Sequence, residues 1–340
     1  MNLAYLYRHT TDSFPLLANV EPVRSSDPVT IARTGSAERT DLQKQLMVRS
    51  MTREELDLTL SWAAKEGWNP GLDDASVFWS TERDGLFVAE VDGEIVGTGS
   101  VARYQPNTYF LGLFIVRPDL RGQGLGRRGF DHWRRVVSRR AAGPSREAPV
   151  IGMDAAPEMQ RFYAANGFQF AHQQTRFCCT VGAWAQYPTL SHEAILDLSV
   201  LPFDMVEAFD RQHFGALRSD FLKQWIWPSS GAARAVVGAD GAIKAMGVIR
   251  KAVRGWRVGP LFATETEAAN LLLHDLCYRA EVPAGDKVYI DVPNVNNAAM
   301  ELADSYQMEV DSTFGRMYFG DARPAVRWQQ VYGITTLELG

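Results

Sequence analysis

Residues 116–128 place three glycines and four arginines in thirteen positions, directly after an apolar run. Glycines at 122, 124 and 126 leave backbone N–H groups uncovered by side chains and tolerate the positive φ angles of a tight turn. If a helix begins within this stretch, its first N–H groups have no intrahelical acceptor and form the positive end of the helix dipole. The stretch therefore predicts a site for an anion, such as a phosphate group.

The loop alone leaves the type of site open. Gly124-x-Gly126-x-x-Gly129 matches the dinucleotide fingerprint, but seven residues separate it from the preceding strand. The Arg-rich run before Glu147 also offers no convincing acidic residue for a ribose. A P-loop is excluded because no Gly-Lys-Ser/Thr follows. A glycine-rich turn before a solvated arginine helix would need no ligand at all.

A mixed order of helices and strands surrounds the loop. Thr52-x-x-Glu55 is a capping box in front of a helical pattern, and Asp92-Gly93 lies between two alternating runs that predict a hairpin. The expected strands are 45–51, the two arms of 85–104, 108–116, 148–155 and 168–181, and the expected helices begin at 53, 125 and 157. The order β-α-β-β-β-α-β-α-β predicts an α/β fold with a mixed sheet.

Part of this pattern appears again in the second half of the chain. Residues 87–101 align with 235–249 and share the Asp-Gly turn, and Arg316 ends its segment as Arg176 ends the earlier one. Hairpin, strand, helix, strand, helix and strand recur in the same order, which predicts two copies of one fold. We expect an irregular extension over 1–44, domains over 45–181 and 195–325, a linker over 182–194 and a tail over 326–340.

Composition excludes several classes of protein. The 340 residues include 40 acidic and 35 basic side chains, a net charge of −5, whereas binding along a nucleic-acid backbone needs many clustered positive charges. The three cysteines (Cys178, Cys179 and Cys277) lack CxxC spacing, so we expect no metal site, no disulfide framework and a reducing cytoplasm. No stretch approaches the roughly 20 apolar residues of a spanning helix, so we expect no membrane partner.

Two motifs carry a resemblance to a known family. Phe114-Ile-Val-Arg-Pro118 with Arg121-Gly-Gln-Gly-Leu-Gly126 resembles motif A of the GNAT superfamily of N-acetyltransferases, and Phe162-Tyr163-Ala-Ala-Asn-Gly167-Phe168 resembles its motif B. Residues 255–263, 288–303 and 315–320 resemble the GNAT-like C-terminal domain of the YitH-like subfamily. The resemblance implies tandem GNAT folds, each a central mixed β-sheet flanked by helices.

The resemblance also implies acetyl-CoA as the donor. Its pyrophosphate would lie on the backbone N–H groups of the glycine loop, and its pantetheine arm would pair with the strand before the loop, whose N–H groups can polarise the thioester carbonyl. The implied cofactor residues are Phe114, Ile115, Val116, Arg121, Gly122, Gln123, Gly124, Leu125, Gly126 and Arg127. The second copy has Glu265 and Glu267 and no glycine at this place, so we expect only the first copy to bind the cofactor.

Tyr163 matches the tyrosine that many family members place near the thioester sulfur, where it can protonate the leaving thiolate. A core tyrosine is the alternative. The base is harder to assign, because the strand 108–116 carries no carboxylate where several family members have a glutamate. Three aspartates remain as candidates for the base or for acceptor contacts: Asp73, Asp74 and Asp154, the last of which could instead cap a helix. Deprotonation through ordered water is a further alternative.

Trp68, the first residue of the stretch 68–79, is a candidate for the wall of the acceptor pocket, and a core position is again the alternative.

Two functions remain. The first is direct transfer of an acetyl group to a primary amine of a small molecule or peptide, with the second copy closing the acceptor cleft or forming an interface. The second is a CoA-binding regulatory or scaffold protein with weak catalysis. The acceptor, the acyl-chain length and a homodimer stay open.

Overall fold

The computed structural model describes residues 45–141, 148–182, 185 and 193–340. The expected extension 1–44 lies outside the described residues, as does most of the expected linker. No helix of the described part of the chain is both long and apolar enough to cross a bilayer.

The elements of the first half follow the expected order with one addition. They are β1 Met47–Ser50, α2 Arg53–Lys65, α3 Asp74–Glu82, β2 Leu86–Val91, β3 Glu94–Tyr104, β4 Thr108–Val116, α4 Leu125–Ala141, β5 Val150–Ala155, α5 Gln160–Ala164 and β6 Phe168–Thr180. Both hydrogen bonds of the Thr52–Glu55 capping box are present, and the hairpin turns at Asp92 and Gly93 with φ of 53° and 81°. The addition is α3, for which the sequence patterns predicted no helix.

The second half repeats this order. Its elements are β7 Ala194–Asp197, α6 Phe203–Phe214, α7 Ser219–Trp225, β8 Gly231–Val237, β9 Ile243–Lys251, β10 Trp256–Ala263, α8 Thr266–Arg279, β11 Lys287–Pro293, α9 Asn297–Ser305, β12 Glu309–Phe319 and β13 Val331–Gly333. Strands β4 and β5 are parallel neighbours in the first half, and β10 and β11 are parallel neighbours in the second. The fold is therefore a mixed α/β architecture built twice.

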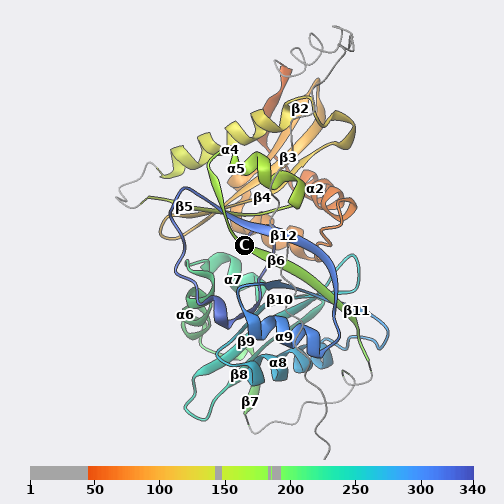
Figure 1. Ribbon diagram of the computed structural model, residues 1–340, viewed down its shortest axis with the longest axis vertical. Coiled ribbons are helices and arrows are strands. Elements are labelled where there is room, and N and C mark those ends of the chain that lie inside the picture. Colours follow the sequence, from red (N-terminus) through yellow and green to blue (C-terminus); the bar gives the residue numbers. More distant parts are fainter. Residues whose placement is uncertain (1–44, 142–147, 183–184, 186–192) are drawn as a thin grey trace, which may run out of the picture.

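The two halves share one sheet and exchange their last long strands. The strand order is β1-β2-β3-β4-β5-β12-β6-β11-β10-β9-β8-β7, with β13 added beside β10. Strand β12 of the second half thus lies between β5 and β6, while β6 of the first half lies between β12 and β11. In Figure 1 the green β6 and the blue β12 run through the middle of the molecule, between the first half above and the second half below. A domain boundary between residues 181 and 195 therefore does not separate the strands into two sheets. The domain limits stay a prediction.

The helices cover the sheet through three large apolar clusters. One joins α2 and α3 of the first half to α6 and α7 of the second, and there the Phe78 ring stacks on Trp225 at 6.5 Å. A second lies under α8 and α9, and a third under α4 and α5. Helix α3 was missed because its Ser, Val, Phe, Trp and Thr residues have modest helix propensity, and packing against α7 stabilises it.

Two buried arginine–aspartate pairs join the exchanged strands to their new neighbours. Arg176 on β6 lies directly opposite Asp291 on β11 and donates to both carboxylate oxygens, at 2.7 and 2.9 Å. Arg316 on β12 lies opposite Asp154 on β5 and does the same, at 2.7 and 2.8 Å. The two arginines occupy equivalent positions of the sequence repeat, so the two bridges are reciprocal. Each bridge links one half of the chain to the other.

Asp291 also accepts a hydrogen bond from Arg257 at 2.9 Å. Burial acts to raise the pKa of Asp291, but Arg176 and Arg257 outweigh it and lower the pKa to about 2. The carboxylate is therefore charged at neutral pH and balances two buried guanidinium groups.

We expect Asp291→Asn to destabilise the whole molecule, because it leaves two buried arginines without their anion. Breaking a buried ion pair in this way costs about 3–5 kcal/mol, so the free energy of unfolding at pH 7 should fall by that amount. The folded pKa of Asp291 lies below the unfolded value of about 3.9, so its contribution is present at neutral pH and is lost as the pH falls from about 4 towards 2. Urea unfolding at several pH values measures both effects.

Asp286→Asn is the matched control for this experiment. Asp286 accepts hydrogen bonds from Lys251 and Trp256, but the side chains of Asp286 and Lys251 are each 35% exposed. Solvent screens such a pair, so this variant should change stability little. Equal stability of the two variants would contradict a central role for Asp291.

Candidate functional site

A cleft of about 770 Å³ opens where β4 and β5 separate. These two parallel strands pair from Thr108 and Val150 to Leu111 and Met153, and no further. Beyond this point β4 continues to Val116 with β3 as its one ladder partner among the described strands. The other edge of β4 faces the cleft and can pair with an extended ligand.

A β-bulge directs β4 away from β5. Thr98 and Ser100 on β3 are opposite Ile115 and Gly112 on β4, so β4 has one extra residue in this interval. Leu113 within the bulge has φ of 49°, and its carbonyl accepts a hydrogen bond from Thr98 Oγ1 at 2.7 Å. Bulges bend the strand that carries them, and this one opens the groove between β4 and β5.

The glycine loop forms one end of the cleft. Gly122 and Gly124 have φ of 75° and 82°, in the left-handed region, and α4 begins at the next residue, Leu125. The predicted cofactor residues that line the cleft are Phe114, Ile115, Val116, Arg121, Gly122, Gly124, Leu125, Gly126 and Arg127. Gln123 is the exception and is close to Asp119, to whose carbonyl its amide donates at 3.5 Å. The structure thus assembles the loop and the strand that the sequence placed together.

The two arginines that were predicted to bind the cofactor, Arg121 and Arg127, both lie close to an acidic side chain, which reduces the positive charge that they offer to an anion. Arg121 donates to the Val116 carbonyl at 2.9 Å and to Glu66 at 2.6 Å, so its charge is already paired. Arg127 is exposed and lies 3.8 Å from Asp131. The unpaired N–H groups at the start of α4 are therefore the stronger anion-binding feature of the loop.

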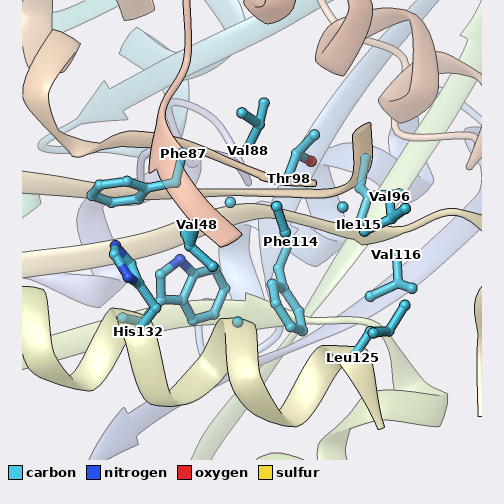
Figure 2. A pocket seen from close by; sticks show the side chains of 15 residues that line it. Val48, Phe87, Val88, Val96, Thr98, Phe114, Ile115, Val116, Leu125 and His132 are labelled. Carbon is cyan, nitrogen blue, oxygen red and sulfur yellow. The ribbon is translucent and has the colours of Figure 1, made fainter. Parts of the chain in front are cut away.

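Apolar packing fixes the N-terminal end of α4 on the strand. A second, much smaller cavity of about 20 Å³ lies between α4 and the sheet. Figure 2 shows Phe114, Val116 and Leu125 along one side of it. The Phe114 and Trp133 rings lie 4.5 Å apart. Gly129 allows this contact, because a Cβ there would be 3.0 Å from Phe114. His132 is half-buried and packs on Phe87 in the same cavity, and burial lowers the pKa of its imidazole, which favours the neutral form.

Tyr163 lies at the closed end of the cleft. Its side chain projects from α5 into a cavity of about 50 Å³ that continues the groove, and only 5% of the residue is exposed. The rings of Phe130, Phe162 and Phe168 surround it at 5.4–6.1 Å. Burial raises the pKa of the Tyr163 phenol, so the group holds its proton at neutral pH. It can act as a proton donor and not as a base.

The carboxylate of Asp154 is paired with Arg316 and is not free. It lines the same cavity as Tyr163, but both carboxylate oxygens accept hydrogen bonds from Arg316. Burial raises the pKa of Asp154, and the Arg316 guanidinium opposes this rise. The alternative of a helix cap is wrong, because Ala156 occupies the cap position.

Asp73 and Asp74 are turned towards the second half of the chain. Asp74 is fully buried; it accepts a hydrogen bond from the Gly71 N–H at 2.8 Å and lies 3.5 Å from Arg250. Asp73 accepts from Ser229 at 2.6 Å. Neither is among the described residues that line the cleft. The start of α3 thus places both away from the cleft, and their role as acceptor contacts stays a prediction.

One wall of the cleft comes from the second half. The sequence left open whether that half closes the cleft or forms an interface, and it did not indicate which residues form the wall. This wall consists of Arg254 and residues 311–314 of β12, and it lies with Trp68 on the border of the cleft. Arg254 contacts Asp311 at 3.3 Å and donates to the Gly67 carbonyl at 3.2 Å, while Arg176 donates to the Trp68 carbonyl at 2.6 Å. Arg254 of the second half and Arg176 of β6 together hold the segment that carries Trp68.

The equivalent groove of the second half is filled. Strands β10 and β11 pair from Trp256 to Val258 and then separate, as β4 and β5 do. Beyond this point β10 pairs with β13 through Leu261 and Phe262. The hydroxyl of Tyr332 on β13 is hydrogen-bonded to the hydroxyl of Thr266 at the start of α8, with 2.8 Å between the two oxygens. No group of three or more His, Cys, Asp or Glu side chains able to hold a metal ion is found in the described ranges.

Comparison with known proteins agrees with this doubled geometry. A family model described as an acetyltransferase (GNAT) domain matches residues 82–170, and a second model with the same description matches residues 206–333. The chain is a tandem GNAT acyltransferase. Its resemblance to motifs A and B is thereby confirmed at the level of the family.

Similar proteins cover most of the chain at low identity. Holothin acyltransferase from Pseudoalteromonas sp. (strain SANK 73390) is 28% identical over 289 residues, which cover 84% of this chain and 92% of the relative. A putative acetyltransferase from Pyrococcus horikoshii has a TM-score of 0.69 at 19% identity and covers 87% of this chain and 96% of its own. A tandem GNAT protein from the clavulanic acid biosynthesis pathway has a TM-score of 0.59 at 14% identity, covering 82% and 100%. The two structures support the fold alone.

Asp154→Asn separates a structural aspartate from a catalytic one. Because the change leaves Arg316 buried without its anion, we expect a loss of about 3–5 kcal/mol in the free energy of unfolding. The pH profile of kcat with any accepted amine should keep the shape of the wild-type profile. Asp57→Asn, which breaks the exposed pair with Arg53, is the control for removal of an aspartate. Loss of kcat by two orders of magnitude at unchanged stability would instead identify Asp154 as the base.

Proposed function

We propose that this tandem GNAT protein transfers an acetyl group directly from acetyl-CoA to a primary amine, and that it binds the cofactor in its first half only. The observation that carries the proposal is the contrast between the two grooves. The first is open and ends at the glycine loop, whereas β13 fills the second. Each half has the splayed strand pair, but one of the two has a free edge.

The residues of the first groove suit the parts of a CoA thioester. The N–H groups from Gly122 to Gly126 would hold the pyrophosphate at the positive end of α4. The free edge of β4 from Phe114 to Val116 would pair with the amides of the pantetheine arm. This places the thioester near the bulge, where a backbone N–H can stabilise charge on the thioester oxygen. CoA supplies the activated acyl group for the reaction.

The residues of the chain account for the protons. The acceptor ammonium loses one proton to water in the cleft and attacks as the free amine. The carbon–nitrogen bond then forms, the carbon–sulfur bond breaks, and the nitrogen releases a second proton to water. Tyr163 donates its phenolic proton to the leaving thiolate and regains one from solvent. Its raised pKa keeps it protonated until that step. Both carboxylate oxygens of Asp154 are hydrogen-bonded to Arg316, and Asp73 and Asp74 lie outside the cleft. Water is therefore the proposed acceptor of the amine protons.

The second groove offers a CoA thioester neither a free edge nor a favourable charge. The ladder of β10 with β13 uses the edge that pantetheine would need. Tyr332 covers the start of α8, where Glu265 and Glu267 would repel a pyrophosphate. These features support one cofactor per chain.

The acceptor would enter between Trp68 and the wall from β12. An aromatic face and the apolar ring of Phe314 suit a small-molecule amine, and one relative of this chain is named holothin acyltransferase. The three free cysteines fit a reducing cytoplasm as the place of the reaction.

Calorimetric titration with acetyl-CoA should give a stoichiometry of one per chain. Gly124→Glu should abolish this binding and the release of free thiol with a panel of amines, because it places a carboxylate in the phosphate loop. Gly241→Glu is the matched control: φ is 78° there against 82° at Gly124, and a side chain would meet open space. Two sites per chain would contradict the assignment of the second groove, and binding without thiol release would favour the regulatory alternative.

Tyr163→Phe should lower kcat by about 10²-fold or more, because the leaving thiolate loses its proton donor. The KM for acetyl-CoA should stay near the wild-type value. Tyr109→Phe, at another buried tyrosine, is the control for loss of a buried hydroxyl. A loss of only a few-fold in kcat would assign Tyr163 to the core.

A further inference from the structure

We propose that the cavity at the closed end of the cleft is an acyl pocket for chains from acetyl to butyryl, and that Leu337 sets its length. The proposal rests on the proposed function, because it assumes that a CoA thioester occupies the first groove. It goes further in naming the acyl groups and the residue that selects among them.

The cavity continues the cofactor groove. Trp68, Phe114, Ala156, Met159 and Phe314 line both the main cleft and the smaller cavity. The remaining walls come from the last paired residues of β4 and β5, Leu111 and Met153 among them. A thioester held along β4 from the glycine loop would therefore direct its acyl group into this space.

The size of the cavity limits the length of the chain. Its volume is about 50 Å³. This is small beside the 770 Å³ of the main cleft, so the cavity has room for a short acyl chain and not for a long one. An acetyl group has three heavy atoms and a butyryl group has five. The lining is largely apolar, and each methylene that enters should gain about fourfold in affinity.

Leu337 belongs to the segment that follows β13. It is 6% exposed and lines the cavity opposite the strands of the first half. Gly112 on β4 allows this approach, because a Cβ there would overlap the carbonyl of Glu338. Tyr104 donates to the carbonyl of Leu339 at 2.8 Å. Figure 1 shows the C-terminal end of this segment between the two halves, and Leu337 belongs to the apolar cluster to which both halves contribute.

The same segment thus has two effects along its length. Val331–Gly333 completes the ladder of β10 and fills the second groove, and four residues later Leu337 limits the first. The acyl pocket is therefore built partly by the half that binds no cofactor.

Calorimetric titration with acetyl-, propionyl-, butyryl- and hexanoyl-CoA tests the proposal without any acceptor. For the wild-type chain we expect affinity to rise about fourfold per carbon up to butyryl. Hexanoyl-CoA should bind at least tenfold more weakly than butyryl-CoA. In Leu337→Ala, which removes three carbons from the floor, hexanoyl-CoA should bind at least as tightly as butyryl-CoA.

Leu339→Ala is the matched control, since Leu339 is fully buried in the same segment but does not line the cavity. It should keep the wild-type order of affinities. The milder Leu337→Val should weaken the discrimination against hexanoyl-CoA if Leu337→Ala does not fold. Equal affinity along the series, or an equal change in both alanine variants, would overturn the proposal. Failure of every acyl-CoA to bind would instead overturn the proposed function.

Discussion

The reciprocal pairs Arg176–Asp291 and Arg316–Asp154 are the interactions on which the rest of the structure depends. Each joins the last long strand of one half to a strand of the other, at positions directly opposite in the ladder. A buried charge must keep its partner, and a shift of one residue would turn each arginine to the other face of the sheet. The two pairs thereby define both the exchange of strands and its register.

The exchange explains why the second half takes part in a cleft of the first. Strand β12 lies beside β5 because Arg316 needs Asp154, and its residues 311–314 then form a wall of the cleft. Strand β6 lies beside β11, and from there Arg176 also holds the Trp68 carbonyl. The bridges that join the halves therefore also position the entrance for an acceptor.

Local sequence signals predicted many elements of this arrangement. The features that depend on contacts between distant residues could not be predicted from the sequence. The capping box at Thr52, the turn at Asp92-Gly93 and the glycine loop each act within a few residues, and the structure contains all three elements. A sequence repeat cannot show whether a last strand pairs within its own half or with the other, because both arrangements bury the same pattern. For the same reason Asp154 looked free: its partner Arg316 lies 162 residues away. Helix α3 depends on packing against α7, which no local pattern shows.

A splayed strand pair leaves backbone groups without partners, and the two halves satisfy them differently. Buried N–H and C=O groups are almost always hydrogen-bonded, so each groove needs an extended segment along its edge. In the second half β13 supplies that segment permanently, with Tyr332 at the helix start where a phosphate group would otherwise lie. In the first half the edge of β4 beyond Leu111 has no such segment among the described residues. The chain thus contains its own model of the bound state, and the groove that lacks an internal strand is the one that a ligand can complete.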